Sequence, residues 1–187
     1  MHIIATEIED VRIIEPRVFK DDRGYFLESY HLRRFESGGL PEVFVQDNLS
    51  FSVQNTLRGL HFQVTQPQAK LIQVITGEIF DVAVDIRRHS PTFGRWVGVH
   101  LSEHNKRQVF IPKGFAHGFC VLSESAHVTY KCSDFYAPDD EGGILWSDPT
   151  IGIKWPITHP IVSDKDEHLP MISDIPPDEL YHPLKTS

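Results

Sequence analysis

The sequence predicts a mainly β protein, built as a sandwich or barrel of short strands, and three observations support this class. Runs rich in Val, Ile, Phe and Tyr recur along the chain, at 10–19, 71–86, 94–101, 107–112, 118–122 and 127–136. Turn-forming residues separate these runs, at 76–78, 89–94 and 102–105. Helical periodicity is scarce, so the alternating strand and helix units of a parallel sheet are not expected.

Two of these elements carry more detailed expectations. The tripeptide Thr76–Glu78 predicts a tight hairpin in which the central glycine supplies the positive φ. In the strand that follows, Asp81 and Asp85 alternate with Val82 and Val84. This alternation predicts a half-buried strand, and no chemistry is expected of its two aspartates.

The remaining elements are one helix and an irregular tail. The helix is expected within 29–39, with Leu32 and Phe35 on one face and two glycines at its end. From about residue 151 the chain is rich in proline and acidic residues, which predicts an irregular segment with short helical turns around the core. No shift in composition divides the chain, so residues 1–187 are expected to form one domain.

The composition narrows the range of functions. Hydrophobic residues make up 40% and charged residues 24% of the chain, as in a soluble globular protein. No run of about 18 apolar residues predicts a membrane span, and the N-terminus lacks the order of a secretory signal, so a cytoplasmic location is expected. The net charge of −8 argues against nucleic-acid binding but not against an anionic small molecule. Cys120 and Cys132 are expected to be buried free thiols, although a disulfide between them is geometrically possible.

Polar side chains interrupt the apolar stretch Leu57–Gln63, and they are the first candidates for a site. The simplest interpretation is an edge strand with one face in water. Arg58 and His61 are three residues apart, so a regular strand would direct them to opposite faces. Gly59 between them could permit a bulge that brings both to one face. A second histidine, His117, follows a Pro–x–Gly turn that delivers it to a strand, although an exposed histidine would fit this pattern equally well.

The segments around His61 and His117 together resemble the two halves of a cupin barrel. Metal-binding cupins carry an HxH pair and a glutamate in the first half and another histidine in the second. Here Gln63 stands in place of the second histidine, and Lys70 occupies the neighbourhood of the glutamate. Two histidines are too few ligands and a lysine would repel a cation, so no metal is expected. A histidine with a lysine and an arginine favours proton transfer on an anionic substrate instead.

Longer motifs between about residues 10 and 170 resemble one family within this group. They are EPRVFKDDRGYFLESY, VQDNLS, LRGLHFQ, GEIFDVAVDIRRHSPTFGRWVGVHLS, NKRQVFIPKGFAHGF, TYKCSDFYAPDDEGGILWSDPTIGIKWP and SDKD. In these motifs the chain is similar to the dTDP-4-dehydrorhamnose 3,5-epimerases, which are metal-free cupins. The resemblance implies a cupin-type jelly-roll barrel with few short helices, no cofactor, and a dTDP-4-keto-6-deoxy sugar as substrate. It further implies inversion at C3 and C5, on either side of the C4 ketone, by removal of a proton from one face and reprotonation from the other.

The same resemblance implies four catalytic residues. His61 matches the family's base and Asp166 the carboxylate that pairs with it. Tyr130 matches the proton donor, and Lys70 fits the cation that stabilises the enolate. Composition alone would make Asp166 a solvated loop charge and Tyr130 a core aromatic with a hydrogen-bonded hydroxyl.

Further positions match residues that hold the sugar, the diphosphate and the nucleotide in the family. They are Arg23, Glu28, Gln46, Asp47, Asn48, Arg58, His117, Tyr136, Glu141 and Lys165. In the family, Arg23 and Glu28 reach the site of the neighbouring subunit through an exchanged N-terminal strand. The resemblance therefore implies a homodimer.

Two other functions stay open from the sequence. A related mono-epimerase that acts at C3 or C5 only, or a ketoisomerase, would share the fold and much of the site. A non-catalytic sugar-binding barrel would explain the polar residues of the cleft. Such a binding protein would have no use for a histidine–aspartate pair opposite a tyrosine.

Overall fold

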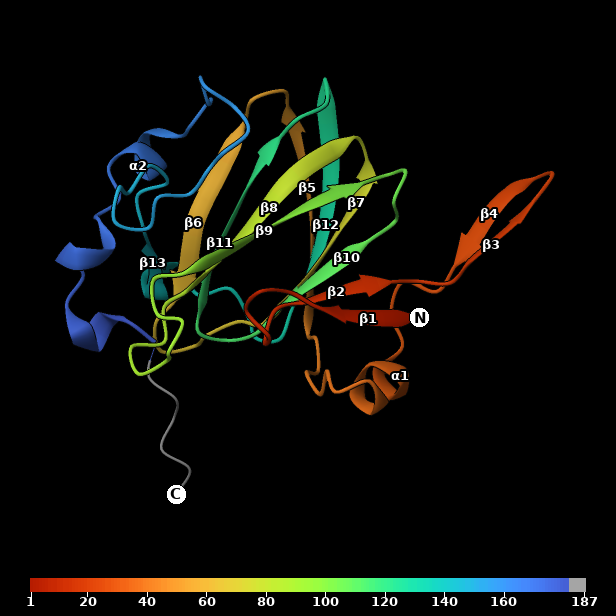
Figure 1. Ribbon diagram of the computed structural model, residues 1–187, viewed down its shortest axis with the longest axis horizontal. Helices are drawn as coiled ribbons and strands as arrows, with labels where there is room; N and C mark the ends of the chain where they lie inside the picture. Colours follow the sequence, from red (N-terminus) through yellow and green to blue (C-terminus); the bar gives the residue numbers. More distant parts are fainter. Residues whose placement is uncertain (182–187) are drawn as a thin grey trace.

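Two antiparallel β-sheets that face each other form the framework of the computed structural model, which describes residues 1–181 (Figure 1). The first sheet runs in the order β1 (His2–Ala5), β2 (Arg12–Glu15), β10 (Gln108–Ile111), β7 (Lys70–Thr76), β12 (Ser125–Cys132) and β5 (Gln46–Val53). The second runs in the order β13 (Glu141–Gly143), β6 (Leu57–Gln63), β11 (Phe115–Val121), β8 (Glu78–Asp85) and β9 (Trp96–Ser102). Strands that are distant in the sequence are neighbours in both sheets, which confirms the predicted jelly-roll architecture.

Helices are few and short in the described part of the chain. The predicted helix is present as α1 (Leu32–Ser37), which buries Phe35 and ends at Gly38, although Leu32 stays exposed. After residue 151 the chain contains α2 (Asp164–Glu167) and the 3₁₀ turns Ile172–Asp174 and Pro177–Glu179; a further 3₁₀ turn is Pro138–Asp140. Within residues 1–181 no helix is long and apolar enough to cross a membrane.

Apolar clusters fill the space between the sheets and cover their outer faces. The inner cluster joins residues of both sheets, among them Ile72, Val109, Val128, Ile79, Val97 and Phe119. On the outside of the second sheet, Phe80 and Val82 pack in a cluster with Trp155, Ile172 and Leu180 of the C-terminal segment. The central strands of the second sheet, β8 and β11, are therefore buried on both faces, and the charged side chains within them have partners.

The turn at Thr76–Glu78 is not the predicted hairpin. Its glycine, Gly77, has the expected positive φ of 83°, but β7 and β8 lie in different sheets and each pairs with other strands. A Cβ on Gly77 would lie 2.1 Å from the carbonyl oxygen of Ser125 on β12. The glycine is thus required both for its φ and for this close approach, and it marks the corner where the chain passes from one sheet to the other.

The strand β8 is not half-buried, as its alternation predicted. The C-terminal segment covers the face that carries Val82 and Val84, and the face that carries the two aspartates lies inside the barrel with Ala83. Every residue from Ile79 to Asp85 is buried. An unpaired carboxylate would be costly in this position. Asp85 accepts hydrogen bonds from the side chains of Arg87, Ser90 and Thr92. The other aspartate, Asp81, belongs to the candidate site.

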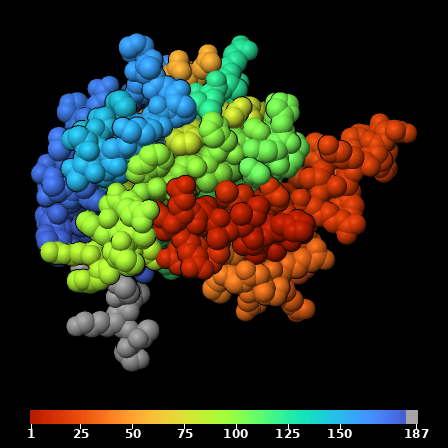
Figure 2. All heavy atoms as spheres, in the orientation of Figure 1, coloured from red at the N-terminus to blue at the C-terminus, as the bar shows by residue number. Residues whose placement is uncertain are grey.

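A two-stranded hairpin projects from the body of the molecule (Figures 1 and 2). It consists of β3 (Val18–Asp21) and β4 (Gly24–Leu27), which pair only with each other among the described strands. The hairpin exposes three aromatic side chains, Phe19, Tyr25 and Phe26. Clustered apolar groups on a projecting element are typical of a surface that another protein covers.

Candidate active site

Two adjoining cavities, of about 290 and 480 Å³, are lined by residues of both sheets. They share the side chains of His61, Lys70 and Tyr130. The smaller cavity adds the predicted site residues Gln46, Asn48, Tyr136 and Glu141, and the larger adds Arg58, His117, Lys165 and Asp166. Together the cavities are large enough for a small-molecule ligand, and most of the predicted site residues line them.

A hydrogen bond joins the two central residues of the site. His61 lies on β6, and its Nε2 is 2.7 Å from Oδ1 of Asp166 on α2. The other carboxylate oxygen of Asp166 accepts the N–H of Gly59 at 3.1 Å. Burial alone would raise the pKa of Asp166, but the hydrogen bonds from His61 and Gly59 outweigh it and hold this pKa below its usual range. An ionised carboxylate only accepts hydrogen bonds, so Nε2 carries a hydrogen and Nδ1 is the basic nitrogen of His61.

Local contacts fix the helix that carries Asp166. Ser163 caps the N-terminus of α2, because its hydroxyl oxygen accepts the N–H of Asp166 at 3.2 Å. Just before this cap, the carbonyl of Ile161 accepts the N–H of Leu57, at the start of β6, at 2.9 Å. The carboxylate and the imidazole are 105 positions apart in the sequence, and these contacts hold them together.

A β-bulge turns both polar side chains of β6 towards the cavities, which confirms the bulge predicted at Gly59. His61 pairs with His117 and Arg58 pairs with Phe119, so three steps along β6 oppose two steps along β11. Gly59 has a φ of +113°, and a Cβ there would lie 2.6 Å from the carbonyl oxygen of His117. Only glycine fits this close approach of the two strands.

His117 forms a second histidine–carboxylate pair, which sequence reasoning missed. Its Nε2 is 2.8 Å from Oδ2 of Asp81, and both side chains are buried. His117 is therefore not an exposed turn histidine, and Asp81 orients a ring that faces the larger cavity. The sequence did contain a signal for this pair, because Asp81 is a carboxylate flanked by the apolar residues Phe80 and Val82.

Lys70 and Tyr130 present their polar ends to the cavities. Neither the Lys70 ammonium nor the Tyr130 hydroxyl makes a hydrogen bond with another residue in the described part of the chain, so both are available to a ligand. Burial lowers the pKa of Lys70, and the negative charges of Asp81 and Glu141 counter part of this effect. Burial raises the pKa of Tyr130, so its hydroxyl is protonated at neutral pH and can act as an acid.

The free thiols expected at Cys120 and Cys132 are both buried and unpaired. Cys132 lines the smaller cavity, and its sulfur lies 3.5 Å from the Asn48 amide nitrogen. Burial raises the pKa of Cys132, so it is a neutral thiol. Its neighbour Asn48 also accepts a hydrogen bond from the Gln46 amide at 3.1 Å, which holds both amides on the cavity side of β5.

Glu141 joins the outer residues of the site to His61. One of its oxygens, Oε2, accepts the hydroxyl of Tyr136 at 2.9 Å and also forms the ion pair with Lys165. The other, Oε1, lies 3.8 Å from Nδ1 of His61. Burial alone would raise the pKa of Glu141, but the hydrogen bonds from Lys165 and Tyr136 outweigh it and lower this pKa.

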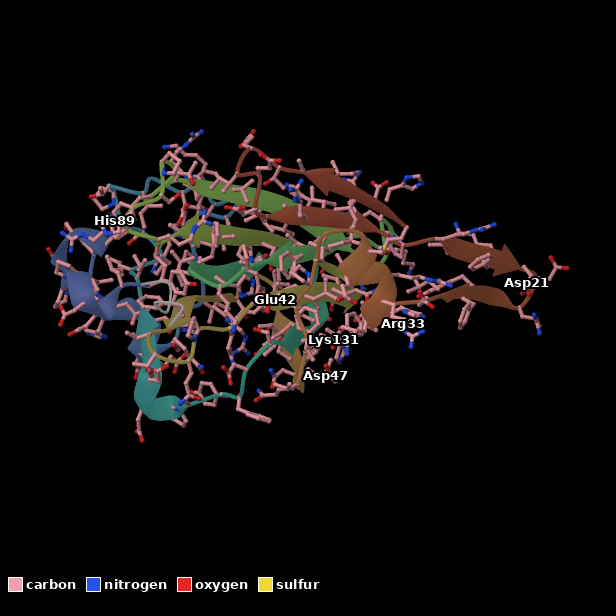
Figure 3. The ribbon with its side chains drawn as sticks, turned by 90° about the horizontal axis from the view of Figure 1, so that it is seen from below. Asp21, Arg33, Glu42, Asp47, His89 and Lys131 are labelled. Atoms are coloured by element: carbon pink, nitrogen blue, oxygen red, sulfur yellow. The ribbon has the colours of Figure 1, made fainter. Side chains whose placement is uncertain are left out.

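Asp47 lies outside both cavities. It alternates with Gln46 and Asn48 on β5, so its side chain points away from the barrel interior. There its carboxylate forms an ion pair with Lys131, 2.9 Å away (Figure 3).

Two further predicted site residues belong to the N-terminal part and also lie outside the cavities. Arg23 sits in the turn of the projecting hairpin, where its guanidinium is 2.6 Å from Asp21, the residue that marks the hairpin tip in Figure 3. Glu28 follows the hairpin and pairs with Arg34 at 2.8 Å. Neither residue approaches the cavities of its own chain.

The arrangement is suited to moving protons on an anionic ligand. A histidine whose tautomer is fixed by a carboxylate faces the same space as a protonated tyrosine. Lysine and arginine side chains line that space and can neutralise anionic oxygens. No group of three or more histidine, cysteine or acidic side chains among residues 1–181 is placed to hold a metal ion.

Comparison with known proteins finds relatives over nearly the whole chain. Residues 5–174 match the family model of dTDP-4-dehydrorhamnose 3,5-epimerase. The dTDP-4-dehydrorhamnose 3,5-epimerase of Shigella flexneri is 56% identical over 168 residues, covering 89% of this chain and 93% of that protein. The enzyme of the same name from Pseudomonas aeruginosa is 58% identical over 161 residues, covering 85% and 89%.

Solved structures agree with this similarity. A dTDP-6-deoxy-D-glucose-3,5-epimerase from Legionella pneumophila, in complex with dTDP-4-keto-L-rhamnose, matches with a TM-score of 0.94 and 50% identity, covering 96% of this chain and 97% of that chain. Among the sequence relatives, a dTDP-4-dehydrorhamnose 3-epimerase from Streptomyces niveus is less similar, with 40% identity over 176 residues, covering 93% of this chain and 85% of that protein.

The pKa of Asp166 predicts a pH-dependent contribution to stability. An unfolded aspartate titrates near about 3.9, and folding lowers this value for Asp166. The ionised carboxylate therefore stabilises the fold above about pH 3.9, and this contribution is lost as the pH falls through the lower folded value. Asp166→Asn should reduce Tm more at pH 7 than at pH 3, as measured by thermal unfolding.

Asp164→Asn is the matched control, since Asp164 is exposed on the same short helix. It should change Tm little at either pH. A loss of Tm in Asp166→Asn that is equal at the two pH values would contradict the assignment.

Proposed function

This chain belongs to the dTDP-4-dehydrorhamnose 3,5-epimerase family, and from that membership we propose how its cavities carry out the reaction. The enzyme is an isomerase that converts dTDP-4-dehydro-6-deoxy-D-glucose into dTDP-4-dehydro-L-rhamnose, in dTDP-L-rhamnose biosynthesis. The observation that carries the proposed mechanism is the His61–Asp166 pair, which faces the same space as the Tyr130 hydroxyl. No cofactor enters the scheme.

The reaction begins with removal of a proton next to the ketone. The hydrogens at C3 and C5 are both acidic because the electrons left behind delocalise onto the C4 oxygen as an enolate. Nδ1 of His61 takes the proton, and Asp166 stabilises the imidazolium that forms. The ammonium of Lys70 stabilises the charge on the enolate oxygen.

Inversion requires a second group on the other side of the sugar ring. Tyr130 fills this role, since burial raises its pKa and keeps the hydroxyl protonated. It delivers a proton to the face opposite His61, so the carbon is rebuilt with inverted configuration. The same pair serves C5 and C3, because both carbons flank the same carbonyl.

The nucleotide half of the substrate carries a diphosphate, which requires cationic side chains, and a base, which requires a flat surface for stacking. Arg58 lies at the exposed side of the larger cavity, where its Nε donates to the Ser52 hydroxyl at 2.9 Å and its Nη2 donates to the Phe51 carbonyl at 3.4 Å. These contacts hold the guanidinium in place, and its remaining N–H groups can donate to a diphosphate. His117 binds the sugar from the interior. The exposed ring of Tyr136 offers a stacking surface for the base at the rim of the smaller cavity.

NMR of the product formed from the thymidine 4-keto-6-deoxy sugar tests the function directly. Inversion at both C3 and C5 is expected. A product inverted at one centre only would identify a mono-epimerase, and release of unchanged substrate without solvent deuterium would identify a binding protein.

His61→Ala should abolish exchange of the C3 and C5 hydrogens with deuterated water, together with epimerisation. Removal of a positioned general base costs about 10²–10⁴-fold in rate, and both centres depend on this base. His104→Ala is the control. This histidine is exposed in the turn between β9 and β10, so its replacement should leave exchange unchanged. Substantial residual exchange at C3 in His61→Ala would point to a different base.

We also propose a homodimer in which the projecting hairpin completes the partner's site. The alternation on β5 supports a covered outer face. Gln46 and Asn48 point to the cavity side, whereas Leu49, Phe51 and Val53 are exposed on the other side. The exposed aromatic residues of the hairpin support the same view. Arg23 in the hairpin turn is distant from the cavities of its own chain, so its proposed substrate contact lies across the dimer.

Arg23→Ala should therefore raise the KM for the nucleotide sugar while leaving Tm nearly unchanged. Lys20→Ala, on the same hairpin, is the matched control and should alter KM little. Steady-state kinetics with sedimentation at assay concentration provides both readouts. A fully active monomer would refute the shared site.

The proposed location is the cytoplasm. A dTDP sugar is a charged molecule that does not cross a membrane unaided, so the enzyme and its substrate must share a compartment.

A further inference from the structure

After each inversion in the proposed reaction, His61 and Tyr130 are left in protonation states that do not allow a second inversion. His61 has gained the proton that left the carbon, and Tyr130 has lost the proton that the carbon received. No net change has occurred in the sugar's proton count, but the enzyme now holds an imidazolium and a phenolate. A second inversion on the same sugar requires His61 to lose its proton and Tyr130 to regain one.

The position of His61 limits the routes by which its proton can leave. Its Nε2–H is held by Asp166, whose other oxygen is occupied by the N–H of Gly59, and the Asp166 side chain is only 5% exposed. The proton acquired from the sugar sits on Nδ1, which faces the cavity. A sugar bound in that cavity would restrict the access of solvent to Nδ1, so direct loss of this proton to solvent would be slow.

Glu141 lies beside this nitrogen on a neighbouring strand. β13 pairs with β6 so that Glu141 is opposite Gln63, and Gln63 and His61 are on the same face of β6. This register places Oε1 of Glu141 3.8 Å from Nδ1 of His61. A small movement of either side chain converts this distance into a hydrogen bond.

The other oxygen of Glu141 connects to the outside of the molecule. Oε2 accepts a hydrogen bond from the Tyr136 hydroxyl and forms an ion pair with the Lys165 ammonium. Both of these residues are exposed. The Glu141 side chain itself is 12% exposed. The carboxylate therefore bridges a catalytic nitrogen and solvent, and its two neighbours hold it in that position.

We propose that Glu141 is a proton relay that returns His61 to its neutral form between the two inversions. The proton on Nδ1 of the His61 imidazolium passes to Oε1 of Glu141, and the resulting carboxylic acid releases it to solvent. A solvent proton restores the Tyr130 phenolate, so each cycle takes up one proton and releases one. The inference rests on the proposed function, because only a reaction with two successive inversions needs this reset while the sugar is bound.

The energetics permit the relay. A carboxylic acid is a stronger acid than an imidazolium, and contacts with Lys165 and Tyr136 lower the pKa of Glu141 further. Each pKa unit against the transfer slows it about tenfold from a limit of about 10¹³ per second, which leaves a wide margin above an ordinary kcat of about 1–10³ per second. The low pKa also ensures that Glu141 releases the proton at once.

The test is Glu141→Gln, which keeps the shape and the hydrogen bond from Tyr136 but cannot carry a proton. In single turnover, the first inversion should proceed and the second should slow, by up to about 10²-fold, so that a sugar inverted at one centre accumulates. The slow step should accelerate with buffer concentration at fixed pH, because a small buffer base replaces the missing relay. Glu141→Asp, which retains a carboxylate, should recover part of the rate without added buffer.

Tyr136→Phe is the matched control. It removes a hydrogen bond to the same carboxylate and should raise KM, but its second inversion should not depend on buffer concentration. If Glu141→Gln slows both inversions equally, or shows no buffer dependence, Glu141 acts in binding only and the relay is refuted. Failure of the wild-type enzyme to invert either centre would instead overturn the proposed function, so the two failures are distinguishable.

Discussion

The hydrogen bond between His61 and Asp166 is the interaction on which the rest of the site depends. It sets the tautomer of His61, leaves Nδ1 as the basic nitrogen and ties the C-terminal segment to the second sheet. It also requires the bulge at Gly59, whose amide holds the second oxygen of Asp166. A side chain at Gly59 would separate β6 from β11, and the His61 imidazole, the Asp166 carboxylate and Arg58 would lose their common orientation.

The interior of the barrel contains an apolar core and several ionisable side chains, and most of these have a partner of opposite charge or a histidine beside them. Asp81 and Asp166 are each matched by a histidine, and Glu141 is matched by Lys165. Lys70 has no such direct partner within residues 1–181, and burial lowers its pKa. In the proposed mechanism an anionic substrate or an enolate is this partner, so binding would relieve a charge that the protein alone leaves poorly solvated.

The sequence predicted the architecture, and most of the residues that it proposed for a site line the two cavities. Its errors have physical causes. Runs of β-branched and aromatic residues identified a mainly β fold, and the glycine between Arg58 and His61 correctly indicated a bulge. Gly77 indicated a turn but not its partners, because a positive φ specifies local geometry and does not specify which strands pair. Asp81 was overlooked because its partner lies on another strand. The pairing of Asp166 with His61 was expected only from a family resemblance, since the two lie 105 positions apart.

In the proposed mechanism His61 and Tyr130 act on opposite faces of one sugar, and Tyr130→Phe separates their roles. The ring still packs and only a hydroxyl is lost, so His61 can form the enolate and return a proton to the side from which it came. In deuterated water, mass spectrometry over time should show recovered starting material that gains deuterium while inverted product is scarce. Inverted product at the wild-type rate would contradict this division of roles, and so would loss of exchange as complete as the loss of inversion.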